Sequence, residues 1–386
     1  MTAWREWVAE EARTIASAGR WRTVDSGPPD RFGAGSGVAL GDSNRPPMVS
    51  FASNDYLGLS KHPAVVAAAA EALARWGTGA GASRLAGGGR PIHAELEAAV
   101  AAWKHAEAAL LFPTGYAANL GLLATLAGPD VRVVSDAANH ASIVDGCRLA
   151  RADVAIYRHG DADHAAALLA EPGPRRRILV SETVFSMDGD IAPVAELATA
   201  CARSGALLIL DEAHDVGGSW SRAPGSGMHE EVVVLRVATL SKFLGSLGGV
   251  VAGPRSFIDL LVNRARSFIF TTATPPGDAA AALAALAIVG SDEGDQLRRD
   301  LRAIIDRIAP GHPSPIIPVV IGSEEDAVAA SACLGGLGLM VPAIRPPTVA
   351  PGTSRLRISV SATHTAEQLD RLESGFDALG LRLLPQ

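Results

Sequence analysis

The sequence has few of the features that mark disulfide-bonded or metal-binding proteins. Its three cysteines, Cys147, Cys201 and Cys333, are far apart, odd in number and without C-x-x-C spacing. This pattern excludes a disulfide framework and a zinc site, and it favours free thiols in a reducing cytosol. We therefore expect no bound metal.

Positive charge and long apolar runs are also scarce. The formal net charge is −7, and the only basic run, Arg175–Arg177, precedes a predicted strand. Nucleic-acid binding depends on clustered Lys and Arg, so no nucleic-acid partner is expected. The longest purely apolar run, Ala279–Val289, is shorter than the roughly 18–20 residues of a membrane span, and Arg5 and Glu6 stand where a signal peptide would be apolar. We expect a cytoplasmic protein that does not bind membranes.

Hydrophobic residues, in contrast, are abundant. They make up 48% of the 386 residues, against 19% charged residues, which indicates a substantial core in a large domain and a smaller one. Alanine-rich stretches at Ala64–Trp76 and Glu95–Trp103 predict packed helices, as do Ala279–Val289 and Leu297–Ile308. Apolar residues between Trp4 and Ile15 have a spacing compatible with one face of an N-terminal helix.

Two apolar runs that end in polar residues are the centre of the prediction. Ala206–Leu210 leads into Asp211, and Val232–Thr239 leads into Lys242. Because ligands bind at the carboxyl ends of the strands in open α/β sheets, we expect the acid and the lysine in one pocket. A carboxylate can keep a pyridine nitrogen protonated, and a lysine can supply an amine to an aldehyde. Pyridoxal phosphate (PLP) requires both groups.

A phosphate-binding turn is the third requirement of PLP. The segment Leu110–Asn119 predicts a strand, a turn and an apolar helix, with the N–H groups of Gly115 and Tyr116 directed at one anion. An ordinary strand–helix turn is the alternative. Gly77–Gly89 is glycine-rich but follows a helix and lacks the lysine of a Walker loop, so neither a dinucleotide fingerprint nor a Walker loop is predicted. Further strands are predicted at Val131–Ser135 and Ile178–Ser181.

Several separate motifs resemble those of one enzyme family. They are Asp211-Glu-Ala-His214 followed by Ser241-Lys242, Ser53-Asn-Asp-Tyr-Leu-Gly-Leu59, Phe185-Ser-Met-Asp-Gly-Asp190 and the segment Ala343–Arg357. Together they are similar to the α-oxoamine synthases, which are fold-type I PLP-dependent transferases, over Arg20 to His364. The resemblance implies an α/β fold with an N-terminal helical arm (1–46), a large PLP-binding domain with a mostly parallel central sheet (47–288) and a smaller C-terminal α/β domain (289–386).

The resemblance also assigns roles around a PLP cofactor. Lys242 would hold the cofactor, Asp211 would face the pyridine nitrogen, and His140 would stack on the ring and assist proton transfer. A buried lysine with a lowered pKa suits this acid–base work. The expected cofactor-binding residues are Gly115, Tyr116, His140, Ser186, Asp211, His214, Thr239, Lys242, Thr271 and Thr272. Among them, Thr271 and Thr272 would reach the phosphate in the other subunit, which implies a homodimer with shared active sites.

Substrate contacts are implied in the same way. The expected residues are Arg20, Asn54, Ser83, His140, Arg345 and Thr348. Arg345 would bind the amino acid's carboxylate, and Ser83 would lie near the substrate of the adjacent subunit. Ile344–Val349 and Ser291–Asp295 look like the family branch that joins L-alanine to a pimeloyl thioester in biotin biosynthesis. The thiol carrier, coenzyme A or acyl carrier protein, is left open.

Two alternatives to this reading are retained. One is glycine C-acetyltransferase or another α-oxoamine synthase, which shares the motifs but differs in substrates. The other is a non-catalytic PLP-fold binding module. Such a module would be expected to lack the lysine or the acid, and Lys242 and Asp211 are both present. A Rossmann dehydrogenase is disfavoured because no glycine fingerprint follows the first strand.

Overall fold

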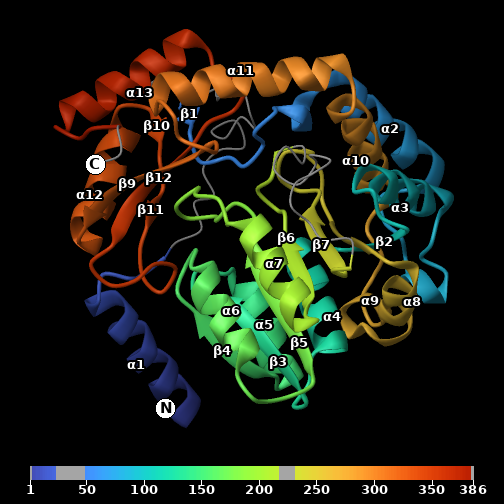
Figure 1. The fold of residues 1–386 in the computed structure, drawn as a ribbon. Helices are drawn as coiled ribbons and strands as arrows, with labels where there is room; N and C mark the ends of the chain where they lie inside the picture. The colour runs from blue at the N-terminus through green and yellow to red at the C-terminus, as the bar shows by residue number, and fades with distance from the viewer. Residues whose placement is uncertain (1, 23–47, 217–230, 384–386) are drawn as a thin grey trace.

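A computed structural model describes residues 2–22, 48–216 and 231–383. In these residues the chain forms a seven-stranded sheet with the order β2-β8-β7-β6-β5-β3-β4 (Figure 1). Its strands are β2 (Ala108–Phe112), β3 (Val131–Asp136), β4 (Asp153–Tyr157), β5 (Arg176–Glu182), β6 (Leu207–Asp211), β7 (Val234–Thr239) and β8 (Gly249–Gly253). Strands β4, β3, β5, β6 and β7 run parallel to one another. Strand β8 is antiparallel to β7 and to β2. The predicted mostly parallel α/β sheet is confirmed.

Helices cover both faces of this sheet. One face packs against α4 (Gly115–Leu126), α5 (Ala141–Ala150), α8 (Arg255–Arg264) and α9 (Arg266–Ile269). The opposite face packs against α6 (Ala162–Ala170) and α7 (Val194–Ser204). Beside the β2 edge lie α2 (Pro63–Trp76), α3 (Pro91–Trp103) and α10 (Pro276–Val289), with α10 against α2 and α3. Short 3₁₀ turns occur at η2 (Leu59–Lys61) and η3 (Arg84–Ala86).

The C-terminal part has a small sheet of its own. Antiparallel strands β11 (Ala343–Ile344), β12 (Ser354–Ser359) and β9 (Ile316–Gly322) form it, with α12 (Glu324–Gly336) and α13 (Ala366–Ala378) nearby. The long helix α11 (Asp292–Ile308) extends between this part and the α2 and α10 helices (Figure 1). In addition, β1 (Val49–Ser50) pairs in parallel with β10 (Leu339–Met340). The start of the predicted large domain therefore packs with the small one, and the three domain boundaries stay predictions.

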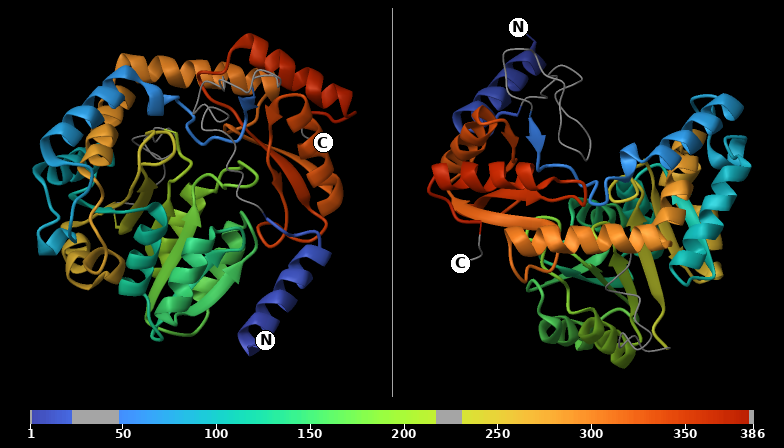
Figure 2. Two further views of the ribbon diagram at one scale, coloured as in Figure 1. Left: turned by 180° about the vertical axis from the view of Figure 1, so that it is seen from behind. Right: turned by 90° about the horizontal axis from the view of Figure 1, so that it is seen from above.

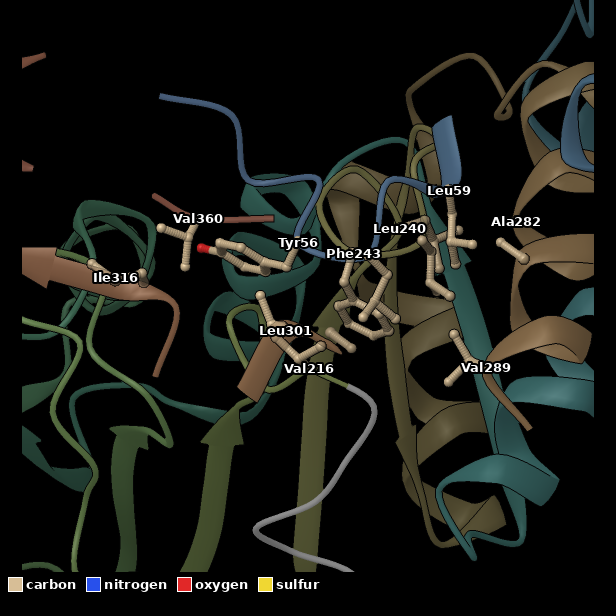
Figure 3. Packing of buried hydrophobic residues seen from close by; sticks show 14 of the residues in the cluster. Tyr56, Leu59, Val216, Leu240, Phe243, Ala282, Val289, Leu301, Ile316 and Val360 are labelled. Carbon is tan, nitrogen blue, oxygen red and sulfur yellow. The ribbon is translucent and has the colours of Figure 1, made fainter. Parts of the chain in front are cut away.

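One apolar cluster joins the two parts and supports the predicted lysine. It contains Leu301 of α11, Val360 beyond β12, and Leu240 and Phe243 after β7 (Figure 3). Leu240 and Phe243 have no exposed surface, and the ring of Phe243 lies 5.8 Å from that of Trp103. Because Ser241-Lys242 lies between these two buried side chains, packing fixes the backbone of the lysine.

The predicted N-terminal helix is present as α1 (Ala3–Ser17), at the periphery of the molecule (Figure 2). None of its residues is buried, and Trp4 is 75% exposed. The three cysteines are free thiols, with Cys147 and Cys201 buried and Cys333 exposed. Over the described ranges, no helix has both the length and the apolar character that crossing a bilayer requires.

Candidate active site

A cavity of about 190 Å³ lies where β5, β6 and β7 end and where α4 and α5 begin. The predicted site residues in its wall are Gly115, Tyr116, His140, Asp211, His214, Thr239 and Lys242. Its other lining residues are Thr114, Asn119, Ser142, Glu182, Ala213, Val237, Ala238 and Ser241. The structure therefore brings the predicted acid and lysine together at the carboxyl ends of parallel strands.

Asp211 is held at the end of β6 by two hydrogen bonds. Its Oδ2 accepts from Nδ2 of Asn119 at 2.7 Å, and its Oδ1 accepts from the backbone N–H of Ala213 at 3.0 Å. Asn119 also donates to Oγ of Ser142 at 2.9 Å, so α4 and α5 both contribute to the arrangement. Asn119 was assigned no role from the sequence, although an amide early in an otherwise apolar helix is a signal that could have revealed it.

The predicted turn and helix are present at the start of α4, and phosphate binding there stays a prediction. Oγ1 of Thr114 caps the helix by accepting from Ala117 N at 3.0 Å. The N–H groups of Gly115 and Tyr116 belong to the first turn, where a helix offers no internal acceptor. Facing this turn, the hydroxyl oxygens of Thr239 and Ser241 lie 2.8 Å apart.

A chain of hydrogen bonds runs from Lys242 into the protein. Nζ of Lys242 lies 2.7 Å from Nε2 of His214, and Nδ1 of His214 lies 2.7 Å from the Tyr56 oxygen. The Tyr56 hydroxyl donates to Oδ1 of Asn54 at 3.1 Å. Because the tyrosine proton points to Asn54, Nδ1 of His214 donates to the tyrosine oxygen. Nε2 of the same ring is then the acceptor for Lys242.

The pKa values of Lys242, His214 and Tyr56 agree with these donor and acceptor assignments. Burial lowers the pKa of Lys242 to about 8, although the nearby Asp211 and Glu182 carboxyl groups act in the opposite direction. Burial also lowers the pKa of His214 well below its usual value, so the ring is neutral. Burial raises the pKa of Tyr56 to about 12, so its hydroxyl keeps the proton. Lys242 can consequently lose its proton near neutral pH, as a nucleophile or base must.

Arg357 lies at the far end of this chain of hydrogen bonds, beyond Asn54. It was not assigned a role from the sequence. Its guanidinium is buried and donates to neutral oxygens: Nε to the Ser186 carbonyl at 2.6 Å, Nη1 to Oγ of Ser359 at 2.7 Å, and Nη1 and Nη2 to Oδ1 of Asn54 at 3.2 Å. Within the described residues, no carboxylate forms an ion pair with Arg357. A buried cation without a counter-ion is a strong anchor for an anionic ligand.

His140 is the N-cap of α5, beside the cavity. Its Nδ1 lies 2.8 Å from Oγ of Ser142 and accepts from the Ser142 N–H at 3.2 Å, which leaves Nε2 to carry the proton of the neutral ring. Burial lowers the pKa of His140, Asp211 opposes this shift, and Lys242 reinforces it. The ring of Tyr116 stands edge-on to His140 with centroids 6.5 Å apart, and its hydroxyl donates to Asp145 at 2.5 Å.

The remaining predicted residues do not line this cavity. Asn54 and Ser186 contact Arg357, as described above. Arg20 pairs with Glu324, and Arg345 donates to the carbonyl groups of Gly19 and Trp21 in the arm. Thr348 is exposed, and Ser83 and Thr271 are half-buried. The roles of these residues and of Thr272 stay predictions.

The residues present fit PLP. The cavity has an anion-binding turn with two hydroxyl groups at one side, a fixed carboxylate at another, and a lysine whose lowered pKa favours the free amine. These are the groups that a phosphate, a pyridine nitrogen and an aldehyde require.

Comparisons with known proteins agree with this assignment. The family model described as "Aminotransferase class I and II" matches residues 46–375. An 8-amino-7-oxononanoate synthase of Anaeromyxobacter dehalogenans is 45% identical, over 98% of this chain and 96% of the relative. One of Burkholderia thailandensis is 47% identical, over 85% of this chain and 87% of the relative.

Solved structures give the same result for the fold. A serine palmitoyltransferase of S. paucimobilis with bound PLP and myriocin is 28% identical and superposes with a TM-score of 0.85, over 98% of this chain and all of that one. The structure of an 8-amino-7-oxononanoate synthase of Francisella tularensis, at 24% identity, has a TM-score of 0.70 over 86% of this chain and 98% of that one, and supports the fold alone.

Fold, cavity and family match define a PLP-dependent enzyme of fold type I. The sequence identities narrow the class to acyltransferases of the α-oxoamine synthase group. The chain belongs to the 8-amino-7-oxononanoate synthase family.

Proposed function

We propose that this enzyme condenses L-alanine with a pimeloyl thioester and releases 8-amino-7-oxononanoate, CO₂ and the free thiol, as a step of biotin biosynthesis. The identity of 45–48% to relatives named for that product supports the assignment. The observation that carries the chemistry is the chain from Lys242 through His214 to Tyr56, Asn54 and Arg357. The alternative, glycine C-acetyltransferase, would use the same residues with a smaller acyl donor. Free thiols fit a cytoplasmic location.

PLP supplies an aldehyde that condenses with an amine and a protonated ring that stabilises negative charge on the neighbouring carbon. Lys242 would hold it, and Asp211 would keep the pyridine nitrogen protonated. Gly115, Tyr116 and Thr239 would bind the phosphate.

Proton transfer falls to the lysine. With a pKa near 8, the amine of Lys242 can take a proton from the α-carbon of alanine and return one after CO₂ has left. The neutral His214 ring accepts a hydrogen bond from that amine and so orients it. His140, in the wall of the same cavity, would cover the ring and exclude water.

The substrate carboxylate needs a cation, and two arginines are candidates. Arg345 was expected from the sequence, but its guanidinium is bonded to carbonyl groups of the arm. Arg357 is buried beside Asn54, and its charge lowers the pKa of Lys242 and of His214. We infer that Arg357 binds the carboxylate and that Arg345 holds the arm against the small sheet.

We also propose a homodimer with shared sites. The backbone N–H of Ala273 donates to the carbonyl of Ala82 at 3.0 Å, so the threonine segment and the glycine-rich loop lie side by side on one surface. Leu85 is 58% and Phe270 69% exposed in this region. An exposed apolar surface of this kind suits contact with a second copy.

The test is product formation by the PLP-loaded protein. Incubation with L-alanine and pimeloyl-CoA should give one free thiol for each molecule of 8-amino-7-oxononanoate identified by mass spectrometry. Lys242→Ala should give neither product. Absence of the product at full PLP loading would refute the proposal.

A further inference from the structure

The cavity wall contains a second carboxyl group, Glu182, whose side chain has no role in the reaction described above. Glu182 ends β5 and is the register partner of Asp211 on the neighbouring parallel strand β6. It is 2% exposed, and its Oε1 has no hydrogen-bond partner in the described part of the chain. Buried polar atoms are nearly always paired, so an unpaired one in a cavity wall indicates contact with a bound group.

The two neighbouring carboxyl groups have different surroundings. Both oxygens of Asp211 accept hydrogen bonds from N–H donors, which stabilise the ionised form. Burial raises the pKa of Glu182 to about 8 and the negative charge of Asp211 raises it further, while Lys242 and the backbone N–H groups of His140 and Ser186 oppose the shift. When surroundings separate two carboxyl groups in this way, one serves as the anion and the other as the neutral acid.

We propose that Glu182 is a further residue of the cofactor site and that its protonated carboxyl group donates a hydrogen bond to the group bound in the cavity. This inference rests on the proposed cofactor site at Lys242. An ionised Glu182 would add a second negative charge beside Asp211 in a cavity built for an anionic phosphate ligand. The neutral acid avoids this repulsion. Its proton, on Oε1 or Oε2, can then be donated to the bound group.

The test measures PLP binding by the full chain instead of turnover. Glu182→Gln keeps the size and a donor but cannot ionise, Glu182→Ala removes the group, and Glu196→Gln, at an exposed position of α7, is the matched control. Apoprotein is titrated with PLP at pH 7 and pH 9, and Kd is read from the visible absorbance of the lysine-bound cofactor. We expect Glu182→Gln to bind PLP as the unsubstituted protein does at pH 7, and Glu182→Ala to bind about tenfold more weakly, the usual effect of one lost hydrogen bond to a charged group.

The pH arm isolates the ionisation of Glu182. Asp211, His140, His214 and Lys242 face the same cavity and are retained in both proteins. From pH 7 to pH 9, Kd should therefore rise more for the unsubstituted protein than for Glu182→Gln. An equal rise in both overturns the proposal even if Glu182→Ala does not fold.

Other outcomes are also decisive. Unchanged binding by Glu182→Ala overturns the proposal, and so does binding by Glu182→Gln that is as weak as that of Glu182→Ala at an unchanged melting temperature. If the unsubstituted protein gives no absorbance that depends on Lys242, the cofactor site itself is wrong and the proposal falls with it.

Discussion

Arg345 and Arg357 belong to one motif, yet the structure gives them different partners. The sequence could not separate them, because both stand in the same segment, Ala343–Arg357, and neither burial nor pairing can be read from it. In β12, residues two apart share a face of the strand. Arg355 and Arg357 consequently point to the Phe185–Asp190 turn, where they contact Asp188 and the Ser186 carbonyl.

The first prediction compares the two arginines. Arg357→Lys should raise KM for L-alanine by about ten- to hundredfold, because an ammonium replaces the planar fork and loses a charge-assisted hydrogen bond of about 1.5–3 kcal/mol. Arg345→Lys is the matched control and should leave KM within about twofold, as is usual for contacts at an exposed surface. Steady-state kinetics at full PLP occupancy decide between them. If Arg345→Lys is the damaging change, the carboxylate belongs to Arg345.

At the scale of elements, the Phe185–Asp190 turn is held by charged contacts. His159 bridges two carboxylates, with Nδ1 2.8 Å from Asp136 and Nε2 2.9 Å from Asp190. Its ring meets Phe185 edge-on with centroids 4.3 Å apart. These contacts fix the turn that carries Ser186, a residue whose role in cofactor binding stays a prediction.

The second prediction concerns pH. Hydrogen bonds to Asp136 and Asp190 raise the pKa of His159 from 6.5 to about 10. Because the folded-state pKa is the higher one, this stabilisation is complete below pH 6.5, decreases as the pH rises and is lost above about pH 10. His159→Gln should therefore lower Tm at pH 6 and have little effect at pH 10.5. The side chain is 36% exposed, so solvent screening keeps the expected decrease in Tm small. An equal Tm difference at both pH values would contradict the assignment.

The third prediction concerns the anion-binding turn. Gly249 of β8 faces the start of α4, and a Cβ atom there would lie 2.4 Å from the Thr114 carbonyl oxygen and 2.5 Å from Gly115 N. Gly249→Ala must therefore displace the turn. We expect PLP affinity to fall by at least about tenfold, as when one charge-assisted hydrogen bond is lost. Gly336→Ala at the end of α12, where a Cβ meets no atom within 4 Å and the backbone is not left-handed, is the matched control for general effects on folding. Normal PLP affinity in Gly249→Ala would show that this turn does not bind the phosphate.

Many of the elements that surround the cavity could be predicted from local patterns. The apolar runs that became β3, β5, β6 and β7, and the alanine-rich α2, α3 and α10, are local signals that the structure confirms. The antiparallel β8, the β1–β10 pair and the order of the small sheet are absent from the prediction, because pairings between distant segments leave no local pattern. Glu182 was missed for the same reason, whereas Asn119 left a local signal, an amide in an otherwise apolar helix, that the prediction did not use. Their importance comes from contact with Asp211 across the fold.

At the scale of the whole molecule, the proposed homodimer builds each active site from two chains. The fourth prediction tests it by mixing two inactive proteins, Lys242→Ala and a Thr271→Ala/Thr272→Ala double variant. If Thr271 and Thr272 act across the interface, a mixed dimer has one site with both intact sets, so up to half of its sites recover activity. Mixed dimers are quantified by separate affinity tags. Mixed dimers without activity would mean that each chain completes its own site.

The most direct test of the proposed reaction compares substrates on one preparation of the enzyme. The measurement is kcat/KM for L-alanine with pimeloyl-CoA and for glycine with acetyl-CoA, at full PLP occupancy. We expect a much larger value for L-alanine with pimeloyl-CoA. A larger value for glycine with acetyl-CoA would contradict the proposed reaction and favour glycine C-acetyltransferase, with the roles of Lys242 and Asp211 unchanged.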